Sequence, residues 1–179
     1  MKSAKVRLTG LKPLLFDRYH GSISAKPEPI EKVYWTDHDE ACIPAINLYS
    51  SLSAENTKSV AKMFYGKNAK PIAMAVNNWL NIQQHELILT RNGKPFHQDN
   101  FASDFQIVHH VARLPKGIPN AKVRPLLPTP WACEFDIEFL PTPDCTWEVL
   151  VKMLQQAGTI GLGTYRPLYG TYKVEIIEN

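Results

Sequence analysis

The segment from Gly161 to Gly170 combines spaced glycines, tyrosines and one arginine, a set that suits contact with a phosphate chain. Gly161, Gly163 and Gly170 can adopt positive φ angles and let another molecule approach the backbone closely. Free amide groups beside a fixed charge favour an anion, and Arg166 offers phosphate a forked, permanently charged donor. The pattern predicts a loop that recognises a nucleic-acid backbone. The alternative is a structural loop, in which the glycines permit close packing and Arg166 pairs with a carboxylate of the same domain.

Tyr165, Tyr169 and Tyr172 interleave with these glycines. Exposed aromatic faces stack on nucleobases without regard to sequence, and each stack contributes about 1–3 kcal/mol. We expect Tyr165 and Tyr169 to stack on bases and Tyr172 to lie in the core. The glycines follow a helix and precede a strand, which is the reverse of the order in a dinucleotide-binding fingerprint.

The chain carries a net charge of +3, and its basic residues gather in segments 1–27, 56–85 and 105–133. The last two segments contain no acid, and Asp17 is the single acid of the first. Convergence of these segments on one groove would give the electrostatic footprint of a nucleic-acid binder, whereas separate segments would be ordinary solvated faces. The basic candidates for phosphate contact are Lys58 and Lys62, spaced i, i+4 on a helix, and Arg113, Lys116, Lys122 and Arg124, which flank a proline-rich loop.

His20, beside Tyr19, is the candidate catalytic residue of an alternative function, metal-independent RNA cleavage. That reaction needs a base at the 2′-hydroxyl and a donor at the leaving oxygen. The sequence offers no comparable pair elsewhere near a basic run.

No metal site or cofactor is expected. Residues 37–39 form an acid–histidine–acid triplet, but neighbours in an extended segment point in opposite directions and rarely ligate one ion. The three cysteines, Cys42, Cys133 and Cys145, are far apart and form no metal-spaced pair.

Alternating apolar residues predict strands at 5–10, 86–90, 105–113, 131–140 and 171–176. Apolar residues at helical spacing predict a helix over 47–65, interrupted near residue 53, and a second from Thr146 that ends with Gly158 as its C′ residue. Residues 71–81 fit either a helix or a strand, and 116–130 are expected to be a proline-rich loop or hairpin tip. Asn92-Gly93 marks a turn.

A length of 179 residues fits one domain, so we expect a single domain over 1–179. The element order predicts an α+β fold with an RRM/ferredoxin-like βαββαβ core, and an inserted hairpin or extended loop at about 66–125. No apolar run is long enough to span a bilayer, and the N-terminus lacks the apolar region of a secretory signal. We therefore expect a cytoplasmic protein with no membrane partner.

Two segments together resemble the RAMP superfamily, the repeat-associated RNA-binding proteins of CRISPR systems. Residues 41–52, ACIPAINLYSSL, lead into a basic helix, and residues 161–176, GLGTYRPLYGTYKVEI, resemble the glycine-rich loop that precedes the last strand of that family. A closer likeness is to uncharacterised RAMP-like proteins of phages and prophages, which share PLL at 13–15. The chain departs from the CRISPR members in its turn, Asn47-Leu48-Tyr49-Ser50-Ser51, and in having Arg166 as the one basic residue at the centre of the loop.

The resemblance implies an RRM-like fold and a subunit that polymerises along a nucleic-acid strand. The function predicted from residues and resemblance together is non-catalytic binding of single-stranded RNA or DNA, with self-association or a related subunit as a further partner. Glu134, Asp136 and Glu138, on one face of a strand, would meet a basic segment of the next copy. Two alternatives are the RNA endonuclease described above and a protein-interaction module, such as a mimic of a CRISPR subunit or a virion component.

Overall fold

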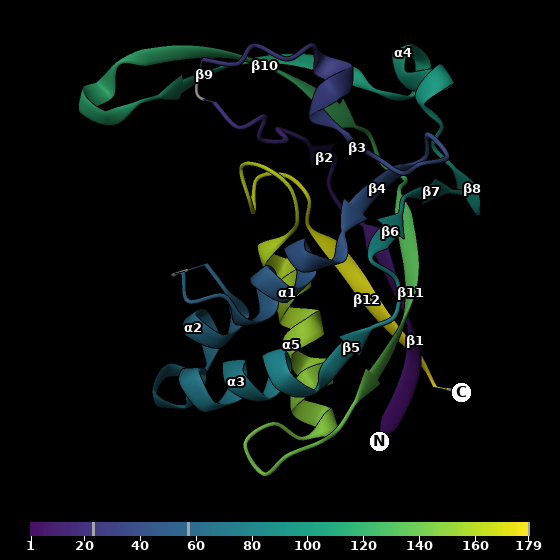
Figure 1. Ribbon diagram of the computed structural model, residues 1–179, viewed down its shortest axis with the longest axis vertical. Coiled ribbons are helices and arrows are strands. Elements are labelled where there is room, and N and C mark those ends of the chain that lie inside the picture. Colours follow the sequence, from purple (N-terminus) through teal and green to yellow (C-terminus); the bar gives the residue numbers. More distant parts are fainter. Residues whose placement is uncertain (23, 57, 179) are drawn as a thin grey trace.

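The computed structural model describes residues 1–22, 24–56 and 58–178, and has an α+β fold with antiparallel sheets. Figure 1 shows two parts: a lower part, in which helices cover one face of a sheet, and an upper part, from which a long hairpin projects. No helix in the described ranges combines the length and the apolar character needed to cross a bilayer.

The lower sheet pairs its strands in the order β12–β1–β11–β5, with every neighbour antiparallel. In its centre, Val6 lies opposite Phe135 on one side and Ile176 on the other. This order is consistent with a ferredoxin-like core. Its four strands are β1 (Lys2–Gly10), β5 (Leu80–Ile82), β11 (Ala132–Phe139) and β12 (Tyr172–Glu178).

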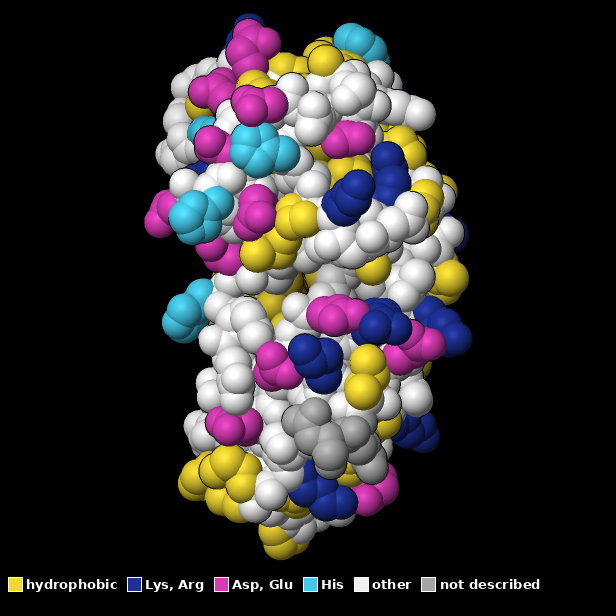
Figure 2. All heavy atoms as spheres, turned by 90° about the vertical axis from the view of Figure 1, so that its right-hand side faces the viewer, with side chains coloured by type: hydrophobic (Ala, Val, Ile, Leu, Met, Phe, Trp, Pro, Cys, Tyr) yellow, Lys and Arg dark blue, Asp and Glu magenta, His cyan; other side chains and the backbone are white. Residues whose placement is uncertain are grey.

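Strand β11 confirms the alternation predicted from the sequence. Cys133, Phe135, Ile137 and Phe139 are buried, and the residues between them are not. A sheet with one face against helices and one in water gives this period of two. The open face, shown in Figure 2, carries mixed acidic and basic side chains over its lower half.

Helices α1, α2, α3 and α5 lie on the other face of this sheet (Figure 1). The interruption predicted near residue 53 is confirmed, since α1 ends at Ser53 and the hydroxyl of Ser59 caps α2 by accepting from Lys62 N. The ambiguous residues 71–81 form most of a helix, α3, and the start of a strand, β5. The helices are α1 (Ala45–Ser53), α2 (Val60–Phe64), α3 (Ala69–Trp79) and α5 (Trp147–Ile160), with a short 3-10 turn η2 (Gly66–Asn68) before α3.

Helix α5 begins as predicted, with Thr146 Oγ1 accepting from Val149 N at 3.3 Å, but its predicted end is wrong. The helix continues past Gly158 to Ile160, and Gly161, at φ 91°, is the cap. Gly158 is needed for a different reason, because a Cβ there would collide with the carbonyl oxygen of Tyr172. A glycine that brings a helix close to a strand therefore resembles a helix stop in sequence.

The upper part consists of two small sheets and the turns between them. The predicted strand at 105–113 is confirmed as β9, but the expected loop at 116–130 is mostly a strand, β10, which pairs with β9 in a long hairpin. One sheet contains β2 (Leu14–Leu15), β9 (Gln106–Arg113) and β10 (Pro119–Leu127), and the other contains β3 (Tyr34–Trp35), β4 (Ala41–Pro44) and β6 (Glu86–Ile88). Strands β7 (Thr90–Arg91) and β8 (Lys94–Pro95) extend the lower sheet beside β11. The remaining elements are the short helix α4 (Phe101–Asp104) and the 3-10 turns η1 (Pro29–Lys32), η3 (Gln98–Asn100) and η4 (Pro115–Gly117).

All three cysteines are buried and free. Burial raises the pKa of Cys42 and Cys133 to about 12 and that of Cys145 to about 11. Unfolded thiols ionise near 9.0, so above this pH the unfolded chain loses protons that the folded chain retains. We expect the free energy of unfolding, measured by urea titration, to be unaffected by the thiols below pH 8 and to fall steadily above pH 9.

The matched variant for this measurement is Cys133→Ala, which removes one of the three titrating thiols. Its free energy of unfolding should fall less steeply above pH 9 than that of the wild type. Parallel curves for the two proteins would show that the buried thiols do not cause the loss.

Candidate nucleic-acid interface

The glycine-rich loop between α5 and β12 is clamped by its own backbone hydrogen bonds. Leu162 N donates to Gly170 O at 3.0 Å, which closes the loop on itself. Gly170 N donates to Pro13 O at 2.8 Å and Thr164 N to Leu15 O at 2.9 Å, which tie the loop to the segment around β2. The free amides predicted from the sequence are therefore wrong for these three groups, which are used within the chain and give the loop a defined shape.

The loop glycines are required by the close approach of backbone to backbone. Gly161, Gly163 and Gly170 have φ angles of 91°, 77° and 74°. A Cβ on Gly161 would lie 2.9 Å from the carbonyl of Gly170, and one on Gly163 would lie 2.5 Å from Leu15 O. A Cβ on Gly170 would collide with the carbonyl oxygen of Leu162. The neighbours that exclude these side chains belong to the chain itself.

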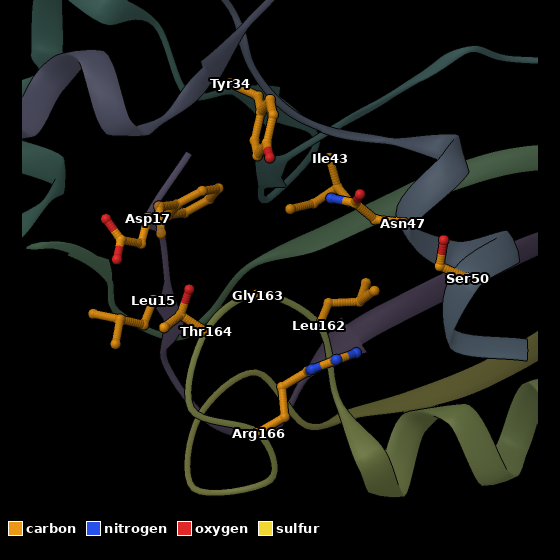
Figure 3. A pocket seen from close by; sticks show the side chains of 11 residues that line it. Leu15, Asp17, Tyr34, Ile43, Asn47, Ser50, Leu162, Gly163, Thr164 and Arg166 are labelled. Atoms are coloured by element: carbon orange, nitrogen blue, oxygen red, sulfur yellow. The ribbon is translucent and has the colours of Figure 1, made fainter. Parts of the chain in front are cut away.

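Arg166 has no carboxylate partner among the described residues, so the ion pair considered as an alternative in the sequence is not observed. Its Nη1 donates to Gly161 O at the long distance of 3.5 Å, and the side chain is half-buried. The guanidinium borders a cavity of about 200 Å³ (Figure 3). A permanent cation at a cavity, with little of its hydrogen-bonding capacity used, is ready to receive an anion.

Three parts of the chain enclose this cavity: the glycine loop, helix α1, and the segments at β2 to β4. In Figure 3 Arg166 approaches from the loop, Tyr34 from the opposite edge, and Asn47 and Ser50 from α1. The lining residues are Leu15, Phe16, Asp17, Tyr34, Ile43, Asn47, Ser50, Leu162, Gly163, Thr164 and Arg166. Polar and apolar groups thus share one hollow.

Asp17 holds three cations at the edge of the same cavity. Its carboxylate accepts from Arg124, with Nη2 at 2.8 Å and Nε at 2.9 Å, and lies 3.7 Å from Lys32 Nζ and 3.9 Å from Lys122 Nζ. Arg124 is only 4% exposed, and Lys32 is buried as well. One negative charge therefore faces three positive ones, which leaves local positive charge beside the loop.

Tyr165 and Tyr169 connect the loop to the β9–β10 hairpin. The guanidinium of Arg124 lies 4.8 Å from the centre of the Tyr165 ring, and His110 packs edge-on against both tyrosines. Tyr169 Oη lies 3.5 Å from His110 Nε2. Tyr165 remains 39% exposed, so part of its ring is open to a ligand. The core position predicted for Tyr172 is confirmed, since this residue is buried and packs against Trp131.

The structure brings some of the predicted residues together and leaves others apart. Tyr165 and Tyr169 of the loop contact Arg124 and His110 of the hairpin. Asp17, which lines the cavity together with Gly163 and Arg166, pairs with Lys122 and Arg124. Arg113 and Lys116 lie at the far end of the hairpin (Figure 1). The helical i, i+4 spacing predicted for Lys58 and Lys62 is wrong, because Lys58 lies in the turn before α2 and only Lys62 lies in that helix. The three basic segments thus meet only in part.

Asp17, the anchor of this cluster, was not predicted from the sequence. A signal was present, because Asp17 is the single acid of residues 1–27. Lys32, Tyr34 and His110 gave no such signal, since their positions depend on how the upper sheets pack over the loop.

His20 lies on the surface, where its Nε2 is 2.9 Å from Glu31 O. The neighbouring Tyr19 is 72% exposed. Neither side chain lines the cavity beside Arg166.

The acidic face of β11 is paired with basic residues of β1. Arg7 Nε lies 2.6 Å from Glu134 and its Nη1 3.7 Å from Glu175, while Lys5 Nζ lies 4.0 Å from Asp136. These exposed pairs account for the mixed charges on the open face of the sheet in Figure 2. That face has no surplus of positive charge for a phosphate chain.

Comparison with protein-family models and with curated proteins finds no match to this chain. A chain in the cryo-EM structure of the Type III-B Cmr-beta bound to cognate target RNA is similar in structure, with a TM-score of 0.57 and 14% identity over 99% of this chain and 61% of that one. This chain therefore spans about three fifths of the length of the chain it resembles. A Cas6 product complex also matches, with a TM-score of 0.33 and 12% identity over 98% of this chain and 52% of that chain. The likeness to the Cmr chain shows that the two chains share a fold.

Proposed function

We propose that this protein binds single-stranded nucleic acid, RNA in the first instance, without cutting it. The observation that carries the proposal is the guanidinium of Arg166, which borders a cavity and has no carboxylate partner among the described residues. Asp17, which lines the same cavity, pairs with Lys32, Lys122 and Arg124, so three cations share one carboxylate at its edge. The similar Cmr-beta structure contains target RNA, and its RAMP-like fold is the reason to test RNA before DNA.

The proposal includes a specific topology for the fold. We assign β1, α1–α3, β5, β11, α5 and β12 to an RRM/ferredoxin-like βαββαβ core of a single domain. The expected insertion at about 66–125 would then begin after β5, because α3 and β5 complete the first half of that core.

Each basic or aromatic residue has a distinct role in this proposal. Arg166 and Lys122 contact phosphates, and the exposed part of the Tyr165 ring stacks on a base. Arg124 is held inside by Asp17, so it positions Tyr165 and adds to the local potential. Gly161 and Gly163 keep the loop in shape. Lys58, Lys62, Arg113 and Lys116, together with Tyr169, would contact a longer strand or a neighbouring subunit.

Self-association along the strand is part of the same proposal. The hairpin exposes apolar side chains on its outer face, with Ile107 43%, Val111 61% and Ile118 54% exposed. An apolar face on a projecting hairpin suits contact with another copy. The measurement is particle mass by light scattering with and without RNA.

Replacing Arg166 by alanine is expected to weaken binding to unrelated single-stranded RNAs by about tenfold or more, because a hydrogen bond to a charged group contributes about 1.5–3 kcal/mol. The slope of affinity against salt should also decrease by about one phosphate contact. Fluorescence anisotropy at two salt concentrations, with single-stranded RNA, single-stranded DNA and duplex DNA, measures both.

The matched control is Lys94→Ala, which removes an exposed cation in β8, away from the loop (Figure 1). It should leave the affinity unchanged. Equal affinities for the wild type and Arg166→Ala would show that the loop is not the contact surface.

A further inference from the structure

The cavity beside Arg166 gathers polar side chains that form no hydrogen bond within the described parts of the chain. Asn47 and Ser50 come from α1, Thr164 from the loop and Tyr34 from β3 (Figure 3). Asn47 offers an amide donor and acceptor, and the other three each offer a hydroxyl. Unused polar groups that converge on one hollow point to a ligand that would complete their hydrogen bonds.

The apolar part of the lining narrows the class of ligand. Phe16, Ile43 and Leu162 contribute apolar surface, and the Tyr34 ring adds an aromatic face. Inorganic phosphate would make no use of these groups. A metal ion would need free carboxylates, but the carboxylate of Asp17 already pairs with Arg124 and Lys32. The lining suits a flat molecule with apolar faces, a hydrogen-bonding edge and a negative charge nearby.

A nucleotide has this combination. Proteins recognise single-stranded RNA by holding splayed bases against aromatic or guanidinium planes and by hydrogen bonds to the base edges. The volume of the cavity is about 200 Å³. Pockets that take whole small-molecule ligands have volumes of about 300–1,000 Å³, so a cavity of this size suits one base of a longer molecule.

We propose that this cavity takes a single nucleotide, with its phosphate on Arg166 and its base edge read by Asn47. The inference rests on the proposed function and adds one position at which binding depends on the base. An asparagine amide presents a donor and an acceptor side by side, which matches the edges of some bases and not of others. Stacking on Tyr165 lacks such discrimination, because every base has an aromatic face.

Asn47 can be replaced without loss of the fold. It lies in the first half of α1, is only partly exposed, and its side chain has no hydrogen-bond partner within the described ranges. Alanine has a higher helix propensity than asparagine, so Asn47→Ala should unfold at the same temperature or slightly above. Asn47→Asp, which replaces the amide donor by an acceptor, is a second variant of nearly the same shape.

The test compares short RNA homopolymers of adenine, cytosine and uracil by fluorescence anisotropy. The wild type is expected to prefer one homopolymer by about tenfold, as for a single base read by a good pair of hydrogen bonds. Asn47→Ala should remove this difference, and Asn47→Asp should change the order of preference. Arg166→Ala should weaken all three homopolymers together, and Lys94→Ala should match the wild type.

The failure of this inference is distinguishable from the failure of the proposed function. If Asn47→Ala and Asn47→Asp keep the wild-type order while Arg166→Ala still weakens binding, the cavity does not read a base, and the proposed function stands. If no RNA binds at either salt concentration, the proposed function fails, and a titration with nucleoside 5′-monophosphates tests separately whether the cavity takes a nucleotide. Base-dependent binding of the monophosphates that is lost in Asn47→Ala would support the nucleotide site, and absence of such binding would overturn it.

Discussion

Replacing Asp17 by alanine is expected to lower the free energy of unfolding by about 3–5 kcal/mol, the cost of removing one partner from a buried ion pair. The carboxylate is 19% exposed and is the shared partner of Lys32 and Arg124, whose side chains are 8% and 5% exposed. Without it, two buried cations would face each other in a poorly solvated site. Urea titration monitored by tryptophan fluorescence measures the loss.

Asp99→Ala is the matched control. Its carboxylate is 88% exposed, and within residues 1–22, 24–56 and 58–178 it pairs with His97 alone, at 3.4 Å. Exposed pairs contribute about 0–1 kcal/mol, so this variant should keep nearly all of the stability. A loss for Asp17→Ala no larger than that of Asp99→Ala would show that water, and not Asp17, compensates the buried cations.

The same substitution has a consequence for the proposed interface. Asp17 fixes Arg124, and Arg124 lies against the ring of Tyr165, so the carboxylate connects the β9–β10 hairpin to the glycine loop. Removing it would add net positive charge and at the same time release the loop tyrosine. We therefore expect Asp17→Ala to alter the proposed interface through its charge and through its geometry.

The sequence predicted those elements that have a strong local pattern. The alternation in β11 and the apolar stripe of α5 each extend over several residues, so the burial of their faces could be read directly. The hairpin was harder to predict, because β10 contains Pro119 and Pro125, and prolines in a sequence indicate a loop. This strand tolerates them because it pairs with β9 on one side, while the short β2 pairs with it on the other side only at Leu126 and Leu127.

The candidate site could be predicted only in part, and the reason is the same for its loop and its cavity. Arg166 and the glycines are neighbours in sequence, and their pattern predicts a loop. Tyr34 and Asn47 reach the cavity from β3 and α1, and no spacing in the sequence connects them to Arg166. Sites assembled from distant segments depend on tertiary packing, and the periodicity of apolar residues in the sequence predicts helices and strands but not how they pack.

Replacing Gly170 by alanine is the second large expected effect, and it tests why the loop needs glycine. Gly170 and Gly93 have nearly equal φ angles, 74° and 77°, so alanine at either position costs about 1–2 kcal/mol in the left-handed region. A Cβ at Gly93 meets nothing within 4 Å, whereas at Gly170 it collides with the carbonyl oxygen of Leu162. Overpacking adds about 1–3 kcal/mol, so Gly170→Ala should lose about 2–5 kcal/mol.

The difference between the two variants isolates the close approach, because their φ angles are nearly equal. Equal losses of stability, measured by urea titration, would show that the loop relaxes around the added methyl group. Binding gives a second readout: Leu162 and Gly170 close the loop from which Arg166 projects, so a displaced backbone would move the guanidinium away from the cavity. Gly170→Ala should therefore also weaken RNA binding under conditions in which it remains folded, whereas Gly93→Ala should bind as the wild type does. Weakened binding in Gly170→Ala alone would tie the shape of the loop, and not only its charge, to recognition of the strand.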